Sequence, residues 1–323
     1  MRISVVVPTC GRPPLLKQCL SSLLRQNFDP SSYEIIIVDD GPHAATRAAV
    51  VECAAQLQEN GPRIIYIASP GPHGPAAARN YGWHAASAPV IAFTDDDTVA
   101  SAEWLQNGLQ AFAPGVKAVW GKIDMPLEGT PTDYERDAKG LETAEFVTAN
   151  CFCSKDVLEQ IDGFDERFRM AWREDADLYF RLLALGGRVV HAPEALITHP
   201  IRPASWGVSM RQQKKILFDA LLYKKHPTLY RQKIRAGARW DYYLIVACLI
   251  AFVIALPAGQ TALAAAAGAI WLLLTLRFFV MRMKGTVKTA SHIAEMLVTS
   301  AVIPPIAVFW RMVGALKFRV ALI

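Results

Sequence analysis

The chain has 323 residues and a net charge of +5 at pH 7, which is distributed unevenly. Residues 1–200 hold 17 Lys and Arg against 26 Asp and Glu, a net charge of −9, whereas residues 201–323 hold 17 against 3, a net charge of +14. This asymmetry argues against one uniform soluble domain. It predicts an acidic enzyme or binding domain followed by a basic, apolar part that meets a membrane. Nucleic acid is the rival partner, but apolar runs between the basic residues favour lipid, so no nucleic acid is expected.

The N-terminus and the cysteines indicate a cytosolic first domain. Met1 and Arg2 lead directly into a strand-like segment, so no signal peptide is expected. The six cysteines show no paired CxxC spacing. We therefore expect reduced thiols.

The first hundred residues alternate between predicted strands and helices. Strands are expected at 3–7, 34–38, 63–67 and 90–94, and helices at 15–24, 44–57 and 76–86. The strands are apolar without period-2 alternation, which is typical of a mostly parallel sheet covered by helices on both faces. The fold class is therefore α/β. No GxGxxG follows the first strand and no GxxxxGK[ST] loop occurs, which disfavours a dehydrogenase and a P-loop NTPase.

The next hundred residues continue this alternation less regularly. A helix is expected at 104–112, a strand at 118–123, a surface loop or flap at 124–137 and a strand at 145–154. A helix at 177–185 follows Glu174 and Asp175, where a helix N-terminus stabilises ionised carboxylates. These two residues could carry chemistry or could only cap the helix.

Polar clusters directly follow three of the predicted strands. They are Pro8–Arg12, Asp39-Asp40 and Asp95–Asp97. Ligands of open α/β sheets bind beyond the carboxyl ends of the strands, so the three clusters predict one site. The aspartate triplet offers hard oxygen ligands that suit Mg²⁺ or Mn²⁺ carrying a substrate's phosphates. The alternative for the triplet is a solvated acidic turn.

Six short motifs occur in a fixed order along residues 1–200. They are Val5-Val6-Val7-Pro8-Thr9 with Arg12, Val38-Asp39-Asp40-Gly41, Ala78-Arg79-Asn80, Phe93-Thr94-Asp95-Asp96-Asp97, Gly163-Phe164-Asp165-Glu166 and Glu174-Asp175. In this order they resemble the motifs of family 2 glycosyltransferases of the GT-A fold. The resemblance implies a nucleotide-binding GT-A-like sheet and a UDP-, GDP- or dTDP-linked sugar donor.

The resemblance also implies roles on the donor side of the site. Asp95 and Asp97 look like the family's DxD pair, which holds Mn²⁺ or Mg²⁺ on the donor's diphosphate, and Asp96 would lie near the ribose or the sugar. His199 is a further candidate near the metal, with a satisfied structural histidine as the alternative. The other implied donor-binding residues are Asp39 at the base with Asp40 beside it, Pro8, Thr9 and Arg12 in the nucleotide pocket, and Arg79 at a phosphate or sugar. The alternative for Arg79 is a surface helix arginine.

On the acceptor side, Asp175 looks like the family's general base, and Glu174 would position Asp175 or the acceptor. A positioned carboxylate takes the proton of the attacking hydroxyl, and attack opposite the leaving group inverts the anomeric centre. The processive members of the family carry a QxxRW motif, whereas this chain has Met210-Arg211-Gln212-Gln213-Lys214-Lys215. This departure favours transfer of a single sugar.

Apolar runs in the last third predict a membrane domain at 241–323. Residues 242–276 carry no formal charge, more than the roughly 20 residues that one spanning helix needs. Pro257 divides the run into a helical hairpin at 242–281. A kinked segment at 293–311 contains Pro304-Pro305 and could span, re-enter or lie in the interface; we favour a kinked, membrane-embedded helix. The alternative for all these runs is a buried globular helical domain.

Residues 201–240 predict basic amphipathic helices beside the membrane. Positions 202–239 hold ten Lys and Arg, one acidic residue and interleaved aromatic and aliphatic side chains, a pattern typical of helices on an anionic leaflet. Basic residues flanking the hairpin place the first domain at the cytoplasmic face of the inner (plasma) membrane. We therefore expect a lipid-linked acceptor, such as a polyprenyl-diphosphate glycolipid, with anchoring for complex assembly as the alternative. The alternative function is a catalytically silent nucleotide-sugar-binding or scaffold protein.

Overall fold

A computed structural model describes residues 1–57 and 61–321, which form two compact units. Unit 1 comprises Met1–Pro126 and Gly140–Ile201, and unit 2 comprises Leu127–Lys139 and Arg202–Ile323. The sequence-based division placed residues 127–139 in the first domain. In the structure this segment packs with unit 2.

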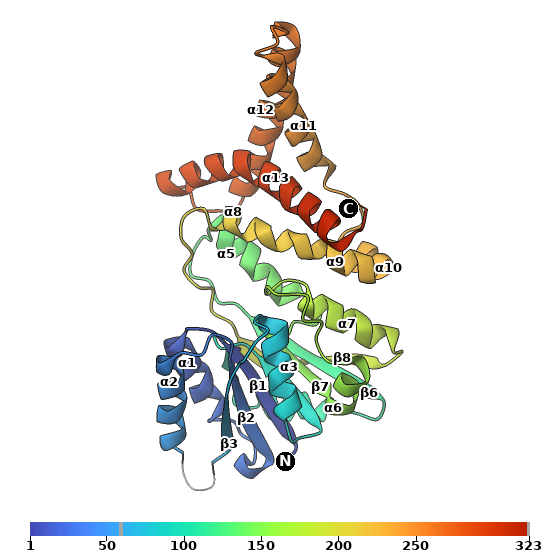
Figure 1. Ribbon diagram of the computed structural model, residues 1–323. Coiled ribbons are helices and arrows are strands. Elements are labelled where there is room, and N and C mark those ends of the chain that lie inside the picture. Colours follow the sequence, from blue (N-terminus) through green and yellow to red (C-terminus); the bar gives the residue numbers. More distant parts are fainter. Residues whose placement is uncertain (58–60, 322–323) are drawn as a thin grey trace. The chain divides into compact units, whose positions relative to one another are not determined.

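Unit 1 is built on an eight-stranded sheet with the order β3-β2-β1-β4-β7-β6-β8-β5 (Figure 1). Four of the seven strand pairings are parallel, and β1 pairs in parallel with both β2 and β4. The strands are β1 (Ile3–Thr9), β2 (Tyr33–Asp39), β3 (Arg63–Ala68), β4 (Val90–Thr94), β5 (Val99–Ala100), β6 (Val116–Asp124), β7 (Asn150–Ser154) and β8 (Arg188–Thr198). The order reverses direction at β1, which is where ligands of such sheets bind.

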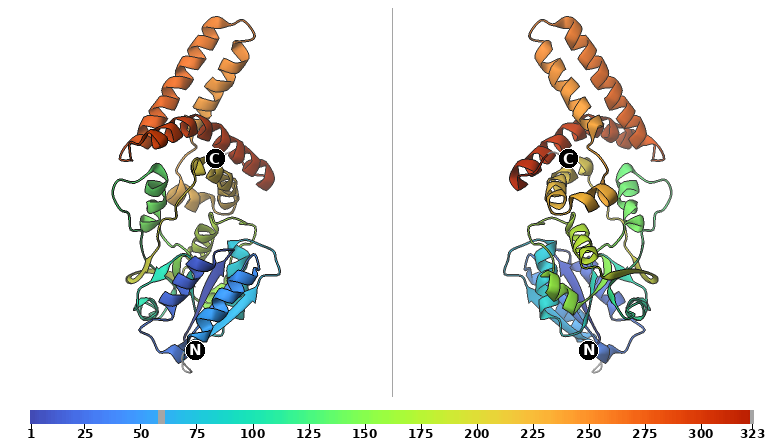
Figure 2. Two further views of the ribbon diagram at one scale, coloured as in Figure 1. Left: turned by 90° about the vertical axis from the view of Figure 1, so that its left-hand side faces the viewer. Right: turned by 90° about the vertical axis from the view of Figure 1, so that its right-hand side faces the viewer.

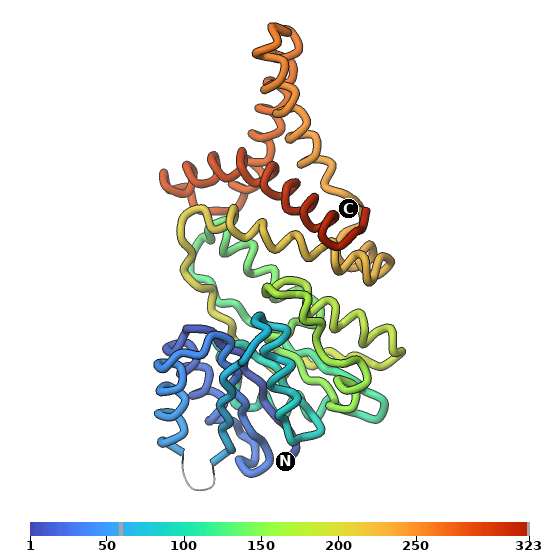
Figure 3. Tube along the Cα trace, viewed as in Figure 1, coloured from blue at the N-terminus to red at the C-terminus, as the bar shows by residue number. Residues whose placement is uncertain are grey.

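Helices cover both faces of this sheet. Val5 and Val7 face a core completed by α1 (Pro13–Leu23), α2 (Ala44–Ala55) and α4 (Trp104–Gln110). Val6 faces the opposite core, completed by α3 (Pro75–Ala85), α6 (Lys155–Ile161) and α7 (Glu174–Ala184). A short 3₁₀ helix, Pro30–Ser32, precedes β2. The Cα trace shows the N-terminus at the sheet end opposite to the carboxyl ends of β1, β2 and β4 (Figure 3).

Two predicted segments of the sequence fold differently from expectation. The strand expected at 145–154 begins only at Asn150, and upstream of it Phe146 has a φ of 53°, which a strand cannot accommodate. The loop expected at 124–137 contains helix α5 (Asp133–Ala138). A capping box starts α5, in which Thr132 and Glu135 exchange side-chain-to-backbone hydrogen bonds.

Unit 2 is mostly helical in its second segment, with non-helical stretches at 202–207, 235–239 and 284–289. Its elements are α5, α8 (Val208–Gln212), a 3₁₀ helix (Gln213–Ile216), α9 (Leu217–Lys225), α10 (Pro227–Leu229), a π-helix (Tyr230–Ile234), α11 (Trp240–Ala255), α12 (Thr261–Met283) and α13 (Ala290–Phe318). A further 3₁₀ helix, Lys139–Thr143, follows α5. α11 and α12 form an antiparallel hairpin (Figure 2). The third apolar run is one helix that continues through Pro304 and Pro305 and bends along its length (Figure 2).

The hairpin leaves its apolar side chains exposed. α12 and α13 are long and apolar enough to cross a membrane, and α11 is a shorter apolar helix. Large apolar residues of the hairpin lie on its surface: Leu244, Ile250, Val253, Ile254, Leu256, Leu263, Ile270, Leu272, Leu273, Leu276, Val280 and Met281. A soluble protein rarely exposes so large a continuous apolar surface. The hairpin is therefore not a buried globular core.

Candidate active site

The candidate site lies at the carboxyl ends of β1, β2 and β4, next to the start of α7 and the end of β8. β1 ends in Thr9, β2 in Asp39 and β4 in Thr94, directly before the aspartate triplet. The predicted clusters that follow these strands therefore meet at one edge of the sheet. Two further predicted residues, Glu174 and His199, join them through the contacts described below.

Asp96 is the most enclosed member of the triplet. Its side chain is fully buried, accepts a hydrogen bond from Thr9 Oγ1 at 2.7 Å and pairs with Arg12 Nη2 at 2.8 Å. Burial raises the pKa of Asp96 to about 6, against the lowering effects of Arg12 and Thr9. A solvated acidic turn would leave this carboxylate in water, so that alternative is wrong for Asp96.

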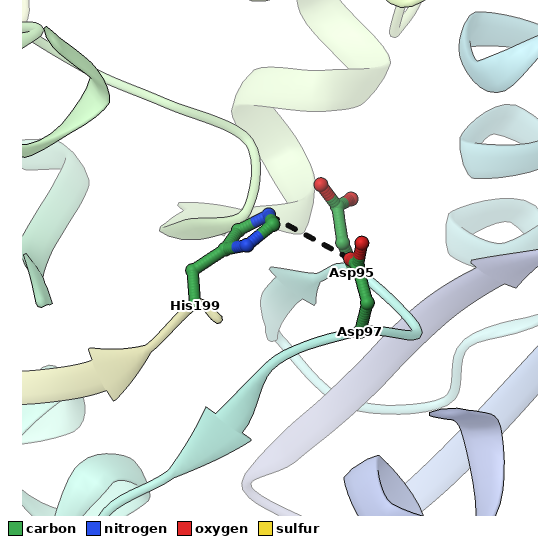
Figure 4. A group of neighbouring side chains, drawn as sticks. All are labelled: Asp95, Asp97 and His199. Atoms are coloured by element: carbon green, nitrogen blue, oxygen red, sulfur yellow. Dashed lines mark ion pairs between the residues drawn. The ribbon is translucent and has the colours of Figure 1, made fainter. Parts of the chain in front are cut away.

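Asp95, Asp97 and His199 form a group with the spacing of metal ligands (Figure 4). One oxygen or nitrogen atom from each lies within 4.8 Å of the others, and His199 Nε2 is 3.6 Å from Asp97 Oδ1. Within the described residues, buried His199 Nδ1 has no hydrogen-bond partner. Two carboxylates and an imidazole fit Mn²⁺ and, with less preference for the nitrogen, Mg²⁺.

Arg79 connects this group to the start of α7. It is 3% exposed, and it donates to Asp95 Oδ1 through Nη2 at 2.8 Å and to Glu174 Oε1 through Nη1 at 3.3 Å. Burial raises the pKa of Asp95, but Arg79 and His199 outweigh burial, so this pKa lies below its usual value. The alternative of a surface arginine is wrong, because the guanidinium lies between two carboxylates inside the fold.

Glu174 and Asp175 open α7 in an environment that favours their neutral forms. Glu174 is 4% exposed, and burial followed by the nearby Asp175 raises its pKa to about 7. Asp175 is half-buried; its Oδ1 accepts a hydrogen bond from the backbone of Ala176 at 2.7 Å, and burial raises its pKa. Arg173, immediately before them, has a φ of 76°. A non-glycine residue in this region is strained, and such strain often marks a functional site.

The Ala78-Arg79-Asn80 and Gly163–Glu166 motifs hold each other in place. Asn80 Nδ2 donates to the carbonyl of Phe164 at 2.9 Å, and the backbone N–H of Phe164 donates to Asn80 Oδ1 at 2.8 Å. The ring of Phe164 also lies 5.7 Å from the guanidinium carbon of Arg79. These contacts fix α3 and thereby the direction of the Arg79 side chain.

Asp39 and Asp40 shape the loops around the site. Asp39 is fully buried, and its Oδ2 accepts hydrogen bonds from Tyr66 Oη at 2.8 Å and from the backbone of His43 at 3.1 Å. Asp40 accepts from the backbone of Gly74 at 2.8 Å and lies 3.2 Å from His73 Nδ1. Base recognition by Asp39 stays a prediction.

Sequence reasoning did not identify Tyr66 and His73 as residues of this region. A signal for Tyr66 exists, because β2 and β3 pair in parallel with Ile37 opposite Tyr66, which places the phenol near the end of β2. His73 belongs to a Gly- and Pro-rich loop. No local pattern in such a loop indicates which side chain turns toward Asp40.

Comparisons with known proteins agree with this architecture. The sequence profile described as "Glycosyl transferase family 2" matches residues 4–169, and that of "Glycosyl transferase family group 2" matches residues 90–313. Among solved structures, mannosyltransferase PcManGT from Pyrobaculum calidifontis, in complex with GDP-Man and Mn²⁺, superposes with a TM-score of 0.60 at 17% identity. That match covers 93% of this chain and 86% of the mannosyltransferase, and it shows the shared GT-A-like fold.

Two curated relatives illustrate the range of similar sequences. Glycosyltransferase AglE of Haloferax volcanii is 25% identical over 224 residues, which is 66% of this chain and 71% of that protein. The GalNAc(5)-diNAcBac-PP-undecaprenol beta-1,3-glucosyltransferase of Campylobacter jejuni is 32% identical over 152 residues, 47% of each chain. Two further relatives are aligned over 57% and 61% of their lengths.

Proposed function

The chain belongs to glycosyl transferase family 2 and is a glycosyltransferase, and we propose that it is an inverting, metal-dependent enzyme that transfers a single sugar to a lipid-linked acceptor. The donor is a UDP-, GDP- or dTDP-linked sugar. The observation that carries this proposal is the link that Arg79 makes between Asp95, in the metal-ligand group, and Glu174, beside the candidate base. The candidate metal site and the candidate general base are thus connected through one arginine.

On the donor side, Asp95, Asp97 and His199 would hold Mn²⁺ or Mg²⁺, and a bound ion would neutralise negative charge on the diphosphate. Arg12 and Thr9 fix Asp96, which we assign to the ribose or the sugar. These contacts hold the Asp96 carboxylate in one position, and a positioned group favours productive binding of the donor.

On the acceptor side, Asp175 would remove the proton from the attacking hydroxyl. The hydroxyl oxygen then bonds to the anomeric carbon while the bond from that carbon to the diphosphate oxygen breaks, and the nucleoside diphosphate leaves. A base works best when its pKa is near the operating pH, and burial raises the pKa of Asp175 in that direction. Glu174, held by Arg79, would position Asp175 or the acceptor.

Three features support a membrane acceptor at the cytoplasmic face of the inner membrane. The α11–α12 hairpin exposes a continuous apolar surface, and residues 202–239 supply basic groups for an anionic leaflet. The name of the Campylobacter relative specifies an undecaprenol-linked substrate for that protein. Single-sugar transfer is supported by the Met210–Lys215 sequence, which lacks the QxxRW motif.

The donor and the metal are tested first by binding. Thermal unfolding of the detergent-solubilised chain is measured with UDP-, GDP- and dTDP-sugars, each with and without Mn²⁺. A donor that binds only the folded state raises the melting temperature by mass action. We expect one nucleotide class to do so in the presence of Mn²⁺ and not in EDTA. Stabilisation that is equal in EDTA would contradict the metal assignment.

Two substitutions then separate binding from chemistry. Asp97→Ala should abolish Mn²⁺-dependent donor stabilisation and turnover. Asp175→Asn should keep donor stabilisation while turnover falls by about 10²–10⁴-fold, the usual contribution of a general base. Asp156→Asn, at an exposed carboxylate of α6, is the matched control and should behave as wild type. If Asp175→Asn lost binding and turnover together, Asp175 would be structural; no turnover in the wild-type chain would favour the scaffold alternative.

A further inference from the structure

Unit 2 holds a partly open cavity of about 260 Å³ that none of the proposed catalytic, donor-binding or metal-binding residues lines. Its walls come from four segments of this unit: the start of α5, the strap 202–205, the start of α8 and the first turns of α13. Small-molecule sites typically measure ~300–1,000 Å³. A cavity just below that range has room for one small ligand but not for a lipid chain.

A buried hydrogen-bond network holds the walls in place. Arg282 is 7% exposed and donates to Asp133 Oδ2 through Nη2 at 2.7 Å and through Nε at 3.0 Å. The same guanidinium donates to Thr299 of α13 at 2.6 Å. Glu295 accepts a hydrogen bond from the backbone of Gly207 at 2.7 Å, which ties the strap to α13. The cavity is thus built by contacts of the fold itself.

His292 lines this cavity with an unused hydrogen-bonding group. Its side chain is 5% exposed, and Glu295 lies 4.0 Å from its Nδ1. Its Nε2 is buried and has no hydrogen-bond partner within the part of the chain that the structure describes. Leaving such a group unsatisfied costs about 1–3 kcal/mol. A hydrogen bond from a ligand that reached Nε2 would recover this cost.

The charges of the lining select the kind of ligand. The wall holds three carboxylates, Asp133, Glu135 and Glu295, and the guanidinium of Arg202. Because Asp133 is also paired with Arg282 and Arg136, these charges balance, and the wall offers no excess positive charge for a phosphate group. Among residues 1–57 and 61–321, the side chains with the spacing of metal ligands are Asp95, Asp97 and His199. The carboxylates of this cavity do not form such a group. A neutral ligand with several hydroxyl groups fits best, because each hydroxyl can donate to a carboxylate and accept from an imidazole or guanidinium N–H.

We propose that this cavity binds one neutral sugar residue. That this sugar belongs to the acceptor rests on the proposed function, whereas the binding itself does not. The cavity would then select acceptors by the identity of a sugar that they already carry.

Sugar binding is tested by saturation-transfer NMR on the full chain in a detergent without a sugar headgroup. The probes are glucose, galactose, mannose, N-acetylglucosamine and N-acetylgalactosamine, and inorganic phosphate is titrated separately by calorimetry. Ser205→Trp fills the cavity from an exposed position. Ser291→Trp is the matched control, because Ser291 is an exposed serine next to His292 that is absent from the cavity wall. Asp97→Ala reports binding at the donor site.

We expect at least one neutral sugar to bind wild type, Ser291→Trp and Asp97→Ala, and to lose its signal in Ser205→Trp. His292→Phe, which removes the ring nitrogen, should weaken binding about 5- to 10-fold, as the loss of one hydrogen bond predicts. Absence of sugar binding, binding that survives in Ser205→Trp, or binding of phosphate alone would overturn the proposal. Donor turnover is measured in parallel, so an inactive chain that still binds sugar in the cavity would overturn the proposed function only.

Discussion

At the scale of single residues, the burial of Glu174 makes the stability of unit 1 depend on pH. Its pKa is about 7 in the fold, against 4.5 for an unperturbed glutamate. Between these two pH values the folded state keeps a proton on Glu174 that the unfolded state has released. The free energy of unfolding therefore falls as the pH rises through this window, by about 3 kcal/mol in total.

Glu174→Gln should remove this pH dependence, because glutamine stays neutral. In EDTA, we expect the stability of the wild-type chain to fall relative to that of Glu174→Gln as the pH rises from 4.5 to 7. Urea unfolding of both proteins in detergent, at half-unit pH steps, measures the difference. Glu52→Gln, at an exposed glutamate of α2, serves as control and should parallel the wild type. Parallel curves for Glu174→Gln would show that Glu174 titrates normally in the fold.

The sequence indicated which residues lie near one another at the candidate site better than it indicated how their side chains interact. The aspartate triplet and Glu174-Asp175 were found from their positions after a strand and before a helix. Arg79 was expected to contact a phosphate or sugar, which stays a prediction, and the structure adds contacts from Arg79 to Asp95 and Glu174 that the sequence did not predict. The contact with Glu174 joins positions 95 residues apart in the chain. Such a contact depends on tertiary packing, which no local pattern encodes.

At the scale of elements, the start of α7 illustrates how backbone geometry positions the candidate base. Arg173 is the N-cap residue of α7, with φ 76° and ψ −5°, in the left-handed region. This conformation turns the chain into the helix so that Glu174 and Asp175 occupy its first turn. The left-handed conformation costs an L-residue roughly 1–2 kcal/mol of conformational free energy, whereas glycine adopts it without this cost.

Arg173→Gly should consequently be more stable than Arg173→Ala by about 1 kcal/mol. Both variants remove the same side-chain contacts, so the difference reports the backbone alone. Urea unfolding in detergent measures it. At Arg47, inside α2 and exposed, the order should reverse, with glycine less stable than alanine by about 1 kcal/mol. The same order at both positions would mean that Arg173 carries no backbone strain.

Elements with a strong local signal were predicted well, and those that depend on long-range contacts were not. The strands at 3–7, 34–38, 63–67 and 90–94 are continuous apolar runs, and each lies within an observed strand. β8 was not predicted as a strand, since its first residues show no regular alternation of polar and apolar side chains. The Thr132-x-x-Glu135 pattern at the start of α5 is typical of a capping box. The helix was still not predicted, because its six residues lie in a polar segment that contains Pro and Gly.

At the scale of the whole molecule, the length of the hairpin helices constrains how they meet a bilayer. α12 has 23 residues and α11 has 16, which corresponds to lengths of about 35 Å and 24 Å. The hydrocarbon core is about 30 Å thick, so α11 is the limiting helix. Trp240 and Tyr243 at its start pack against each other at 5.8 Å, and aromatic residues of this kind anchor helix ends at the membrane interface.

We expect the turn between α11 and α12 to reach the outer side of the membrane, with both outer ends of the hairpin in the cytoplasm. Ala258→Cys marks the turn, and Lys284→Cys marks the exposed end of α12; both are made together with Cys10→Ser, which removes an exposed thiol. In intact spheroplasts of a bacterial host, a membrane-impermeant maleimide should label position 258, and position 284 only after permeabilisation. The basic residues that flank the hairpin favour this orientation. Labelling of both positions only after permeabilisation would mean that α11 is too short to span and that the hairpin re-enters. Labelling of position 284 in intact spheroplasts, with position 258 labelled only after permeabilisation, would place the glycosyltransferase site outside the cell.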